Sequence, residues 1–310
     1  MTTAAIKYTL TMNDWRDYDW SDVKPLPVPD VPGHVAQIAY SADFRDAMAL
    51  FRAVMAAHEL SERALALTTG VIKLNPAHYS VWDYRLEVCE TIGNRVFDYR
   101  AVGLTPESAS PPPIGDNGEW LNMFTLANAK NYQVWNYRQH LLDAENPLWF
   151  KNERLVVAMV LEDDAKNFHA WSHLKWCITR GATAFDPEEL LGWAAKLLAD
   201  DVLNNSVWSF RHFVLHLYPQ ARSEAELSYV LAQISEQPEN ESVWSYLTGL
   251  LALMPDLKPA AVQAAEPYTH TGQARAVEFL AENSRPAEAR EYYKKLAQLE
   301  PARKEFWITR

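Results

Sequence analysis

One tryptophan-centred phrase recurs through this 310-residue chain and limits its fold more than any other feature. The phrase is clearest in residues 130–138, which read Lys-Asn-Tyr-Gln-Val-Trp-Asn-Tyr-Arg. Its tryptophans stand at Trp82, Trp135, Trp171, Trp208 and Trp244. The last four are separated by 36, 37 and 36 residues, and the first interval of 53 is the same period with an insertion. A constant period of this length is typical of an array of helical hairpins.

Each repeat is predicted to contain two helices joined by a short polar turn. The first helix is apolar, as in residues 155–161, and the turn carries an asparagine that suits the cap of the second helix. In the first repeat, Asn75 followed by Pro76 predicts that the second helix begins there. The inserted residues 105–118 are rich in proline and predict a surface loop.

The second helix is predicted to present two faces. At about 100° per residue, Tyr132 and Arg138 lie within about 60° of Trp135. Gln133 and Tyr137 point almost the opposite way. The tryptophan column therefore predicts the core between repeats, and the other column is expected to face elsewhere.

Columns that change from repeat to repeat mark a candidate site, because only structural positions must recur in all of them. Five residues before the tryptophans stand Ala77, Lys130, Lys166, Leu203 and Glu239, and two before stand Ser80, Gln133, His169, Ser206 and Ser242. Three residues before stand Tyr79, Tyr132, Phe168, Asn205 and Glu241. The lysines, Gln133, His169 and the aromatic residues are confined to the early repeats, so a site is predicted there.

Composition restricts the ligands and the setting. The net charge of −11 argues against a general nucleic-acid binder, and a polyanionic ligand would have to be met by local cations. Cys89 and Cys177 form no CxxC pair and no signal peptide is evident, which favours a cytoplasmic location. No apolar run approaches the roughly 20 residues of a membrane span, so membrane insertion is not expected.

The two ends of the chain are predicted to differ from the repeats. Residues 1–40 form an extended, proline-rich leader, and residues 41–310 form the helical-hairpin repeat domain. The leader is either a disordered tail or packed along another surface, such as that of a partner subunit, and its aromatic residues favour the second. Residues 274–282 and 286–299 are predicted to be a closing helical pair.

Two of the phrases resemble a known family. Residues 129–135 and 165–171 are similar to the second and third repeats of the alpha subunit shared by protein farnesyltransferase and geranylgeranyltransferase type I. The resemblance covers nearly the whole chain, including the leader from Trp20 to Pro32 and the fifth phrase. It implies an all-α fold, a right-handed superhelical crescent of stacked helical hairpins.

The resemblance also implies a function. The chain is expected to be the alpha subunit of a heterodimeric CaaX protein prenyltransferase, active only with a beta subunit. Such an enzyme transfers a farnesyl or geranylgeranyl group from its diphosphate to a cysteine thiol near the C-terminus of a substrate protein. The required Zn²⁺ is expected on the beta subunit, Mg²⁺ is also implied, and the beta subunit mainly sets which isoprenoid is used.

Six residues are assigned roles by this resemblance. Lys130 is the expected catalytic residue, which stabilises charge on the leaving diphosphate; the ordinary alternative is a solvated lysine at a helix start. The other donor-site residues are expected to be Tyr132, Asn167 and His169, with Lys166 as a lesser addition. Gln133 and Tyr79 are expected to contact the acceptor peptide, although each tyrosine could equally be a core residue. Phe168 replaces the usual family tyrosine, so any hydroxyl contact to the diphosphate is missing there.

Two other functions compete with this one. The first is the alpha subunit of the Rab geranylgeranyltransferase, which uses an escort protein; the phrase around Gln133 favours the farnesyl type. The second is a tetratricopeptide-like scaffold, but that repeat is about 34 residues long and carries a Trp-Leu-Gly pattern absent here. The histidine pairs 169/173 and 212/216 could ligate a metal, but no third ligand is evident, so no metal site is expected in this chain.

Overall fold

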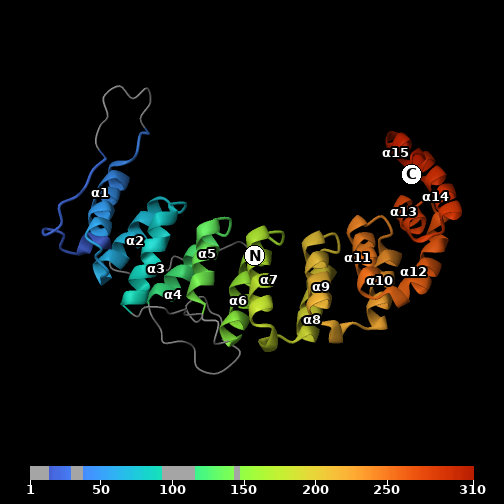
Figure 1. Ribbon diagram of the computed structural model, residues 1–310, viewed down its shortest axis with the longest axis horizontal. Helices are drawn as coiled ribbons and strands as arrows, with labels where there is room; N and C mark the ends of the chain where they lie inside the picture. Colours follow the sequence, from blue (N-terminus) through green and yellow to red (C-terminus); the bar gives the residue numbers. More distant parts are fainter. Residues whose placement is uncertain (1–13, 29–37, 93–115, 143–146) are drawn as a thin grey trace. The chain divides into compact units, whose positions relative to one another are not determined.

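The computed structural model describes residues 14–28, 38–92, 116–142 and 147–310, and every regular element in these residues is a helix (Figure 1). Up to residue 181 these are η1 (Trp15–Asp17), α1 (Ala42–Ala56), α2 (Glu62–Leu74), α3 (Tyr79–Thr91), α4 (Asp116–Ala127), α5 (Tyr132–Leu141), α6 (Pro147–Asp163) and α7 (Phe168–Arg180). The longer helices after it are α8 (Pro187–Asp200), α9 (Asn205–Leu217), α10 (Glu224–Glu236), α11 (Glu241–Leu253), α12 (Lys258–Ala265), α13 (Ala274–Asn283), α14 (Pro286–Leu299) and α15 (Lys304–Ile308). Short 3-10 turns connect several of them: η3 (Ala182–Ala184), η4 (Pro219–Ala221), η5 (Pro255–Leu257), η6 (Glu266–Thr269) and η7 (Pro301–Arg303).

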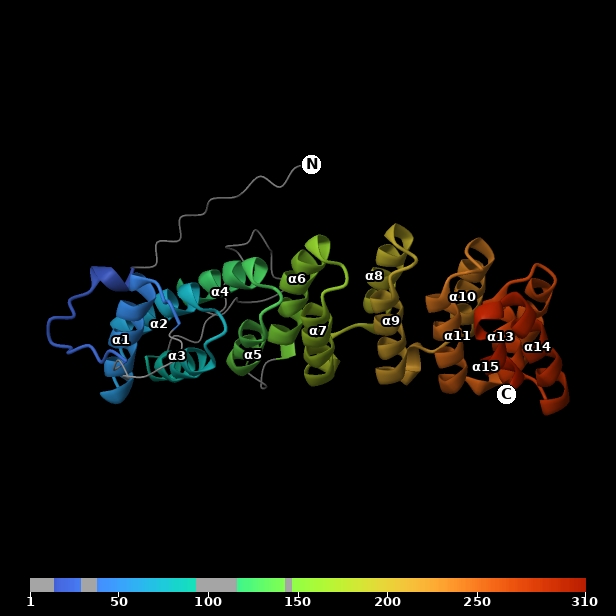
Figure 2. The same cartoon turned by 90° about the horizontal axis from the view of Figure 1, so that it is seen from above.

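Five helical hairpins carry the five tryptophan phrases. They are α2 with α3, α4 with α5, α6 with α7, α8 with α9, and α10 with α11. In the first three hairpins, the second helices α3, α5 and α7 lie in one row and the first helices α2, α4 and α6 in another (Figure 2). The all-α fold of stacked helical hairpins is therefore confirmed.

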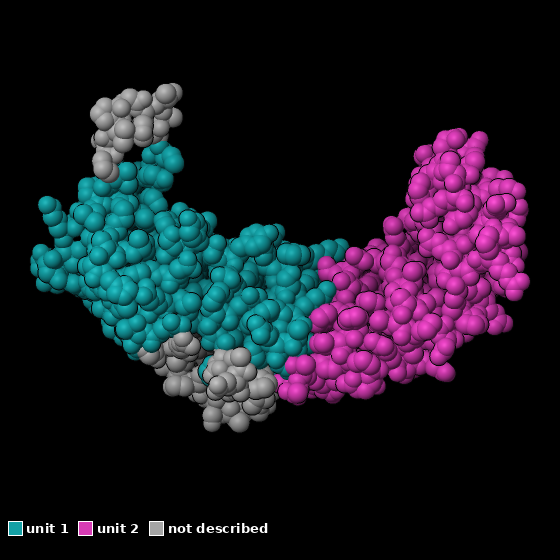
Figure 3. Space-filling view, in the orientation of Figure 1, with its two compact units in different colours: residues 1–181 teal, residues 182–310 magenta. Residues whose placement is uncertain are grey.

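The contacts divide the chain into two compact units, residues 1–181 and residues 182–310 (Figure 3). Three of the hairpins, α2 to α7, belong to the first unit. The second unit contains the other two hairpins and the predicted closing pair, which is confirmed as α13 packed against α14. All the candidate site residues therefore fall within the first unit.

The same bond closes the turn of every repeat. The indole Nε1 of each repeat tryptophan donates to the carbonyl oxygen six residues earlier, at 2.8 to 3.0 Å. In four repeats an asparagine four residues before the tryptophan caps the second helix with its side-chain oxygen; these are Asn131, Asn167, Asn204 and Asn240. Both groups form hydrogen bonds with the backbone of the turn, and Asn167, Asn204 and Asn240 are buried there, which explains why the sequence repeats them.

The first repeat departs from the predicted pattern. Asn75 ends α2 and α3 begins only at Tyr79, so the predicted helix start at Asn75 and Pro76 is wrong. Asn75 stands seven residues before its tryptophan, and its side-chain oxygen accepts from the Ala77 amide at 3.2 Å inside the turn. It therefore shapes the turn, and His78 holds the N-cap position without a side-chain cap.

Both faces of the second helix are buried, which corrects a second expectation. The tryptophans are at most 5% exposed, as predicted, but Tyr137, two residues after Trp135, is only 2% exposed. Its ring packs against that of Trp82 in the preceding repeat, with centroids 5.1 Å apart. The second column therefore does not face away from the core, because this helix lies between one hairpin before it and another after it.

The described part of the leader packs against its own chain. The ring of Trp15 lies so close to Gly70 of α2 that a Cβ there would overlap it. Arg63 of α2 binds Asp22 through two hydrogen bonds of 2.7 and 2.8 Å. Leader residues 29–37 lie outside the described residues, as do residues 105–115 of the predicted loop. The last three residues of that loop are helical, because α4 begins at Asp116.

Candidate functional site

Lys130 lies in the turn immediately before the cap of α5, with its side chain 81% exposed. Its ammonium Nζ is 3.3 Å from Oδ2 of Asp164, which follows the end of α6 in the next repeat. The turn is held in place because Asn131 caps α5 and Trp135 donates to the carbonyl of Ala129, the residue before the lysine. A turn held by these hydrogen bonds therefore presents an exposed cation to solvent.

Three aromatic residues extend from the row of second helices. Tyr79, Tyr132 and Phe168 are the first residues of α3, α5 and α7, and they are 65%, 71% and 69% exposed. Tyr132 lies on the tryptophan side of its helix yet remains exposed at the helix start, where its ring meets that of His169 in the next hairpin. Tyr79 and Tyr132 are therefore not core residues.

Tyr132 and His169 are brought into direct contact. The two rings have centroids 4.2 Å apart and planes at 87°, an edge-to-face arrangement. His169 is half-buried, and burial lowers the pKa of its imidazole below the ordinary value, so it is uncharged at neutral pH. It can accept or donate one hydrogen bond without competing with Lys130 as a cation.

Asn167 is a buried residue of the turn, only 3% exposed. Its side-chain oxygen accepts from the Ala170 amide at 3.0 Å, and its Nδ2 donates to the Ala129 carbonyl at 3.4 Å. That carbonyl also accepts from Trp135. Asn167 therefore links the turn of the third repeat to the turn that carries Lys130, and its own amide is already engaged.

Contacts and repeat position connect the six predicted site residues in different ways. Asn167 of the third-repeat turn donates to the carbonyl of Ala129, the residue before Lys130, and Asp164 of the same turn pairs with the Lys130 ammonium. Tyr132 contacts His169 through their rings. Gln133 follows Tyr132 in the chain and is half-buried. Tyr79 is the counterpart of Tyr132 one repeat earlier, and its ring packs against that of His78. Four of the six residues therefore form two pairs, each of which joins the second repeat to the third.

A pocket of about 1010 Å³ adjoins the Lys130–Asn167 pair at the turns of the first three repeats. Its lining includes Lys130, Asn167 and Asp164, with Glu162 and Asp163 at the end of α6. Sequence reasoning missed Asp164, although the repeat alignment places it seven residues before Trp171, in the same turn column as Asn75. The sequence could have indicated Asp164, because it is a charged residue at a repeat position that lies in the turn.

The histidine pairs serve other purposes. His173 is 1% exposed and its Nε2 lies 2.7 Å from Glu153, whereas His212 contacts the Gly249 carbonyl at 3.3 Å. Within the part of the chain that the structure describes, no group of three or more histidine, cysteine or acidic side chains could hold a metal ion. No helix among the described residues is both long and apolar enough to cross a bilayer.

Comparison with known proteins finds the same repeat. A family profile described as "Protein prenyltransferase alpha subunit repeat" matches residues 61–92, 119–145, 150–181 and 223–254. The hairpin of α8 and α9 falls outside these matches but has the same tryptophan bond and asparagine cap. The structure therefore adds a repeat to those recognised by the profile.

Individual proteins are similar over most of the chain. The protein farnesyltransferase/geranylgeranyltransferase type-1 subunit alpha of Candida albicans is 30% identical over 242 residues, which are 75% of this chain and 73% of that protein. A solved structure of Candida albicans protein geranylgeranyltransferase-I complexed with GGPP matches with a TM-score of 0.77 and 29% identity, covering 94% of this chain and 98% of that chain. The geranylgeranyl transferase type-2 subunit alpha of Rattus norvegicus is 28% identical over 208 residues, only 35% of its length.

Proposed function

The chain belongs to the family of alpha subunits of protein farnesyltransferase and geranylgeranyltransferase type I, and on that premise we propose that it is the alpha subunit of a CaaX protein prenyltransferase. The enzyme transfers a farnesyl or geranylgeranyl group from its diphosphate to a cysteine thiol near the C-terminus of a substrate protein. The observation that carries the proposal is that the turn and the first helical residue of one repeat present exposed Lys130 and Tyr132, with the Tyr132 ring in contact with that of His169.

The partner is a beta subunit that covers the starts of α3, α5 and α7. Exposed aromatic residues such as Tyr79, Tyr132 and Phe168 are typical of a surface that binds another protein or a ligand. The described residues offer no group of three or more metal ligands, so we assign the zinc to this partner, where it would hold the substrate cysteine as a thiolate; Mg²⁺ would accompany the diphosphate.

Lys130 acts on the leaving group. As the sulfur–carbon bond to the isoprenoid forms, the carbon–oxygen bond to the diphosphate breaks and its electron pair leaves with the diphosphate. A positioned ammonium stabilises that developing charge. His169 and Tyr132 line the donor beside it, and Asn167 contributes by holding the turn, because its side chain is buried and already bonded.

The acceptor peptide is recognised by neighbouring residues of the same row. Gln133, at the second position of α5, offers an uncharged amide that can donate to the peptide carboxylate. Tyr79, the first residue of α3, lines the peptide site. Phe168 holds the corresponding place on α7, where its ring packs but cannot donate to the diphosphate.

The test is prenylation of a CaaX peptide by the chain co-expressed with its beta subunit, assayed separately with farnesyl and geranylgeranyl diphosphate. Lys130→Ala should lower kcat by about 10²-fold, the typical loss when one charge-stabilising group is removed. Lys196→Ala, which removes an exposed lysine of α8, is the matched control and should leave kcat unchanged. Equal turnover of the wild type and Lys130→Ala would remove the catalytic role.

Two outcomes would favour the alternatives. Prenylation that depends on an escort protein instead of a free peptide would indicate a Rab-type subunit, a possibility disfavoured because the type-2 relative matches over only 35% of its length. A chain that binds no beta subunit and no isoprenoid diphosphate would indicate a scaffold. The proposed enzyme acts in the cytoplasm, which suits two buried cysteines that form no disulfide.

A further inference from the structure

The faces of α5 and α7 meet in a ladder of contacts beneath the proposed donor site. The outermost contact joins Tyr132 to His169, and the next joins Trp135 to His173, with ring centroids 5.0 Å apart. Burial increases along the ladder, since Tyr132 is 71% exposed and Trp135 only 4%. Any shift of α5 against α7 at the buried end is therefore transmitted to the site at the exposed end.

The buried end is a charged triad, here called the Glu153 brace. Glu153 of α6 accepts from Arg138 Nη2 and Nε of α5 at 2.7 and 2.8 Å, and its Oε2 lies 2.7 Å from Nε2 of His173 of α7. All three side chains are 0% exposed. Arg138 also donates to Asn122 of α4 at 2.9 Å, so the Glu153 brace ties four helices together.

The second unit contains an equivalent buried triad, here called the Glu226 brace, although none of the candidate site residues lies in that unit. Arg211 of α9 donates to Glu226 of α10 twice at 2.6 Å, and the Tyr246 hydroxyl of α11 donates to Glu226 at 2.6 Å. The sequence spacings, 15 and 20 residues, equal those of the Glu153 brace. Tyr246 also packs against Trp208 with centroids 5.0 Å apart, as His173 does against Trp135.

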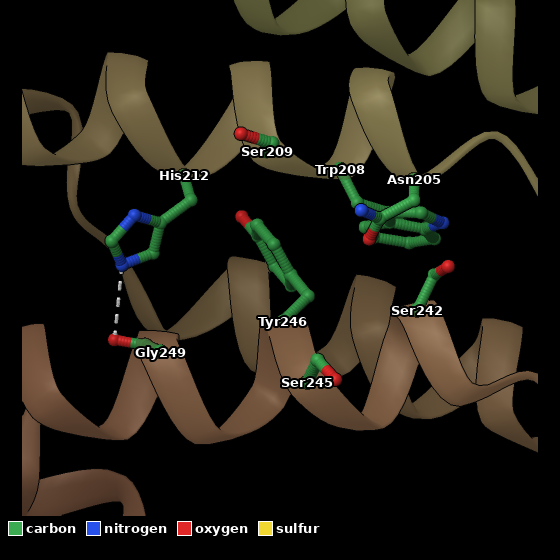
Figure 4. A pocket seen from close by; sticks show the side chains of 8 residues that line it. All are labelled: Asn205, Trp208, Ser209, His212, Ser242, Ser245, Tyr246 and Gly249. Carbon is green, nitrogen blue, oxygen red and sulfur yellow. Dashed lines mark hydrogen bonds between the residues drawn. The ribbon is translucent and has the colours of Figure 1, made fainter.

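The two units differ at the exposed end of this ladder. Where Tyr132 and His169 touch in the first unit, the second unit has Asn205 and Ser242. A pocket of about 260 Å³ opens there between α9 and α11, with both of these residues in its lining (Figure 4). The chain therefore supplies its own comparison: one brace lies beneath the Tyr132–His169 contact, and the other lies beneath a pocket that Asn205 and Ser242 line at the corresponding positions.

We infer that Glu153 and His173 are positioning residues for the donor site, a conclusion that rests on the proposed function. The Glu153 brace fixes the separation and rotation of α5 and α7, and thereby the distance from Lys130 and Tyr132 to His169. Directional, buried, charge-assisted hydrogen bonds suit this task better than apolar packing, because they specify one geometry. Displacements of about 1 Å at a reacting site can cost about 10²-fold in rate.

The test compares Glu153→Gln with the matched control Glu226→Gln in the full heterodimer. Both variants remove one charge from an equivalent buried triad, so both should lower thermal stability. Only Glu153→Gln should raise the KM for the isoprenoid diphosphate, by about fivefold or more, because donor-binding residues sit on both helices. The KM for the peptide should change less than about twofold, since Gln133 and Tyr79 do not depend on α7.

A second pair of variants keeps the test usable if Glu153→Gln fails to fold. His173→Phe retains the Arg138–Glu153 pair but removes the contact to α7, and should raise the donor KM. His173→Tyr copies the Glu226 brace and should restore the donor KM to within about twofold of wild type.

Each result decides between the two conclusions. An active wild-type pair in which Glu153→Gln and Glu226→Gln give the same donor KM would overturn this inference alone. A wild-type pair that neither binds isoprenoid diphosphate nor prenylates peptide would overturn the proposed function and this inference with it.

Discussion

At the scale of single residues, position within the repeat decides whether a side chain is scaffold or site. Trp135 and Tyr132 are three residues apart on the same side of α5, yet one is 4% exposed and the other 71%. Tyr132 stands at the first position of α5, where its ring touches His169 of the neighbouring hairpin without being buried by it, whereas Trp135 lies almost one turn further along the helix. The early repeats place the proposed site residues at the start of the second helix, and the later ones place Asn205 and Glu241 there.

Asp164 is the residue whose effect on the site is most directly testable. Its carboxylate pairs with Lys130 and carries the same sign of charge as a diphosphate, so it competes for the ammonium. Because the lysine is 81% exposed, the pair contributes little, about 0–1 kcal/mol. Asp164→Asn should therefore tighten isoprenoid diphosphate binding by up to about fivefold, measured as Kd of the heterodimer at low salt.

The matched control is Asp201→Asn, which changes the same turn column one repeat later, in the second unit. It should leave the Kd unaltered. Weaker binding by Asp164→Asn would mean that Asp164 orients Lys130 productively, contrary to the expectation.

At the scale of elements, hairpins within a unit are linked by polar groups as well as by tryptophan packing. Asn240 repeats in the second unit what Asn167 does in the first, since its Nδ2 donates at 2.9 Å to the Val202 carbonyl that also accepts from Trp208. The two braces repeat in the same way. These buried polar groups are satisfied by partners in adjacent helices, which is the condition for tolerating them in a core.

The Glu153 brace should make the first unit sensitive to acid. Burial lowers the pKa of His173, and its contacts with Glu153 offset this only partly; Arg138, Cys177, Trp135 and Trp176 surround it. Burial alone would raise the pKa of Glu153, but Arg138 and His173 hold it well below the ordinary range. Because the Glu153 carboxylate is ionised, His173 Nε2 carries the hydrogen and Nδ1 remains unpaired.

The sign of the pH dependence follows from these shifts. Unfolded His173 binds a proton below about pH 6.5 while the folded residue stays neutral, so stability is complete above that pH and falls below it. The stability from Glu153 is present above about pH 4.5 and is lost at lower pH. His173 should therefore dominate between pH 7 and pH 5.5, with a loss approaching about 1.4 kcal/mol per pH unit.

Urea unfolding at several pH values, monitored by hydrogen exchange of α7, measures this loss. His173→Tyr should flatten the pH dependence, because a phenol stays neutral throughout the range. His216→Tyr, at an exposed histidine of α9, is the control. Identical slopes for wild type and His173→Tyr would show that the imidazole does not titrate as argued.

At the scale of the whole molecule, the candidate site belongs to one of the two compact units. Tyr79, Tyr132 and Phe168 together expose large apolar rings on three consecutive hairpins, and the chain carries a net charge of −11. A surface of this kind on one unit favours a partner that covers the row as a whole.

Tyrosine accessibility tests this arrangement. Nitration of the isolated chain should modify Tyr79 and Tyr132, and complex formation with the beta subunit should reduce modification at both by about tenfold, as expected for rings buried in a protein interface. Tyr246, only 4% exposed, gives the background level. Unchanged nitration of Tyr132 in an active heterodimer would place the partner elsewhere.

The site in the early repeats stays a prediction, whereas the repeat array and its five tryptophans could be predicted from the sequence. Periodicity suffices for these features because each hairpin is a local structure, and positions that recur must serve the scaffold. Four of the six predicted site residues form two pairs between the second and third repeats, and Asn167 and Tyr132 show why exposure could not be predicted. Asn167 is assigned to the site by its match to the family phrase, yet it is buried. Tyr132 lies on the same side of its helix as the buried tryptophan, yet it is exposed.

Only the tertiary structure decided how the hairpins are joined. The burial of Tyr137, the Lys130–Asp164 pair and the Glu153 brace each depend on residues brought together from different repeats. A helical wheel describes one helix and contains no information about its neighbours on both sides, which is why the second buried face was missed. Local sequence determined the helical hairpin that repeats along the chain. The contacts between hairpins determined which polar side chains are buried in hydrogen bonds and which remain exposed.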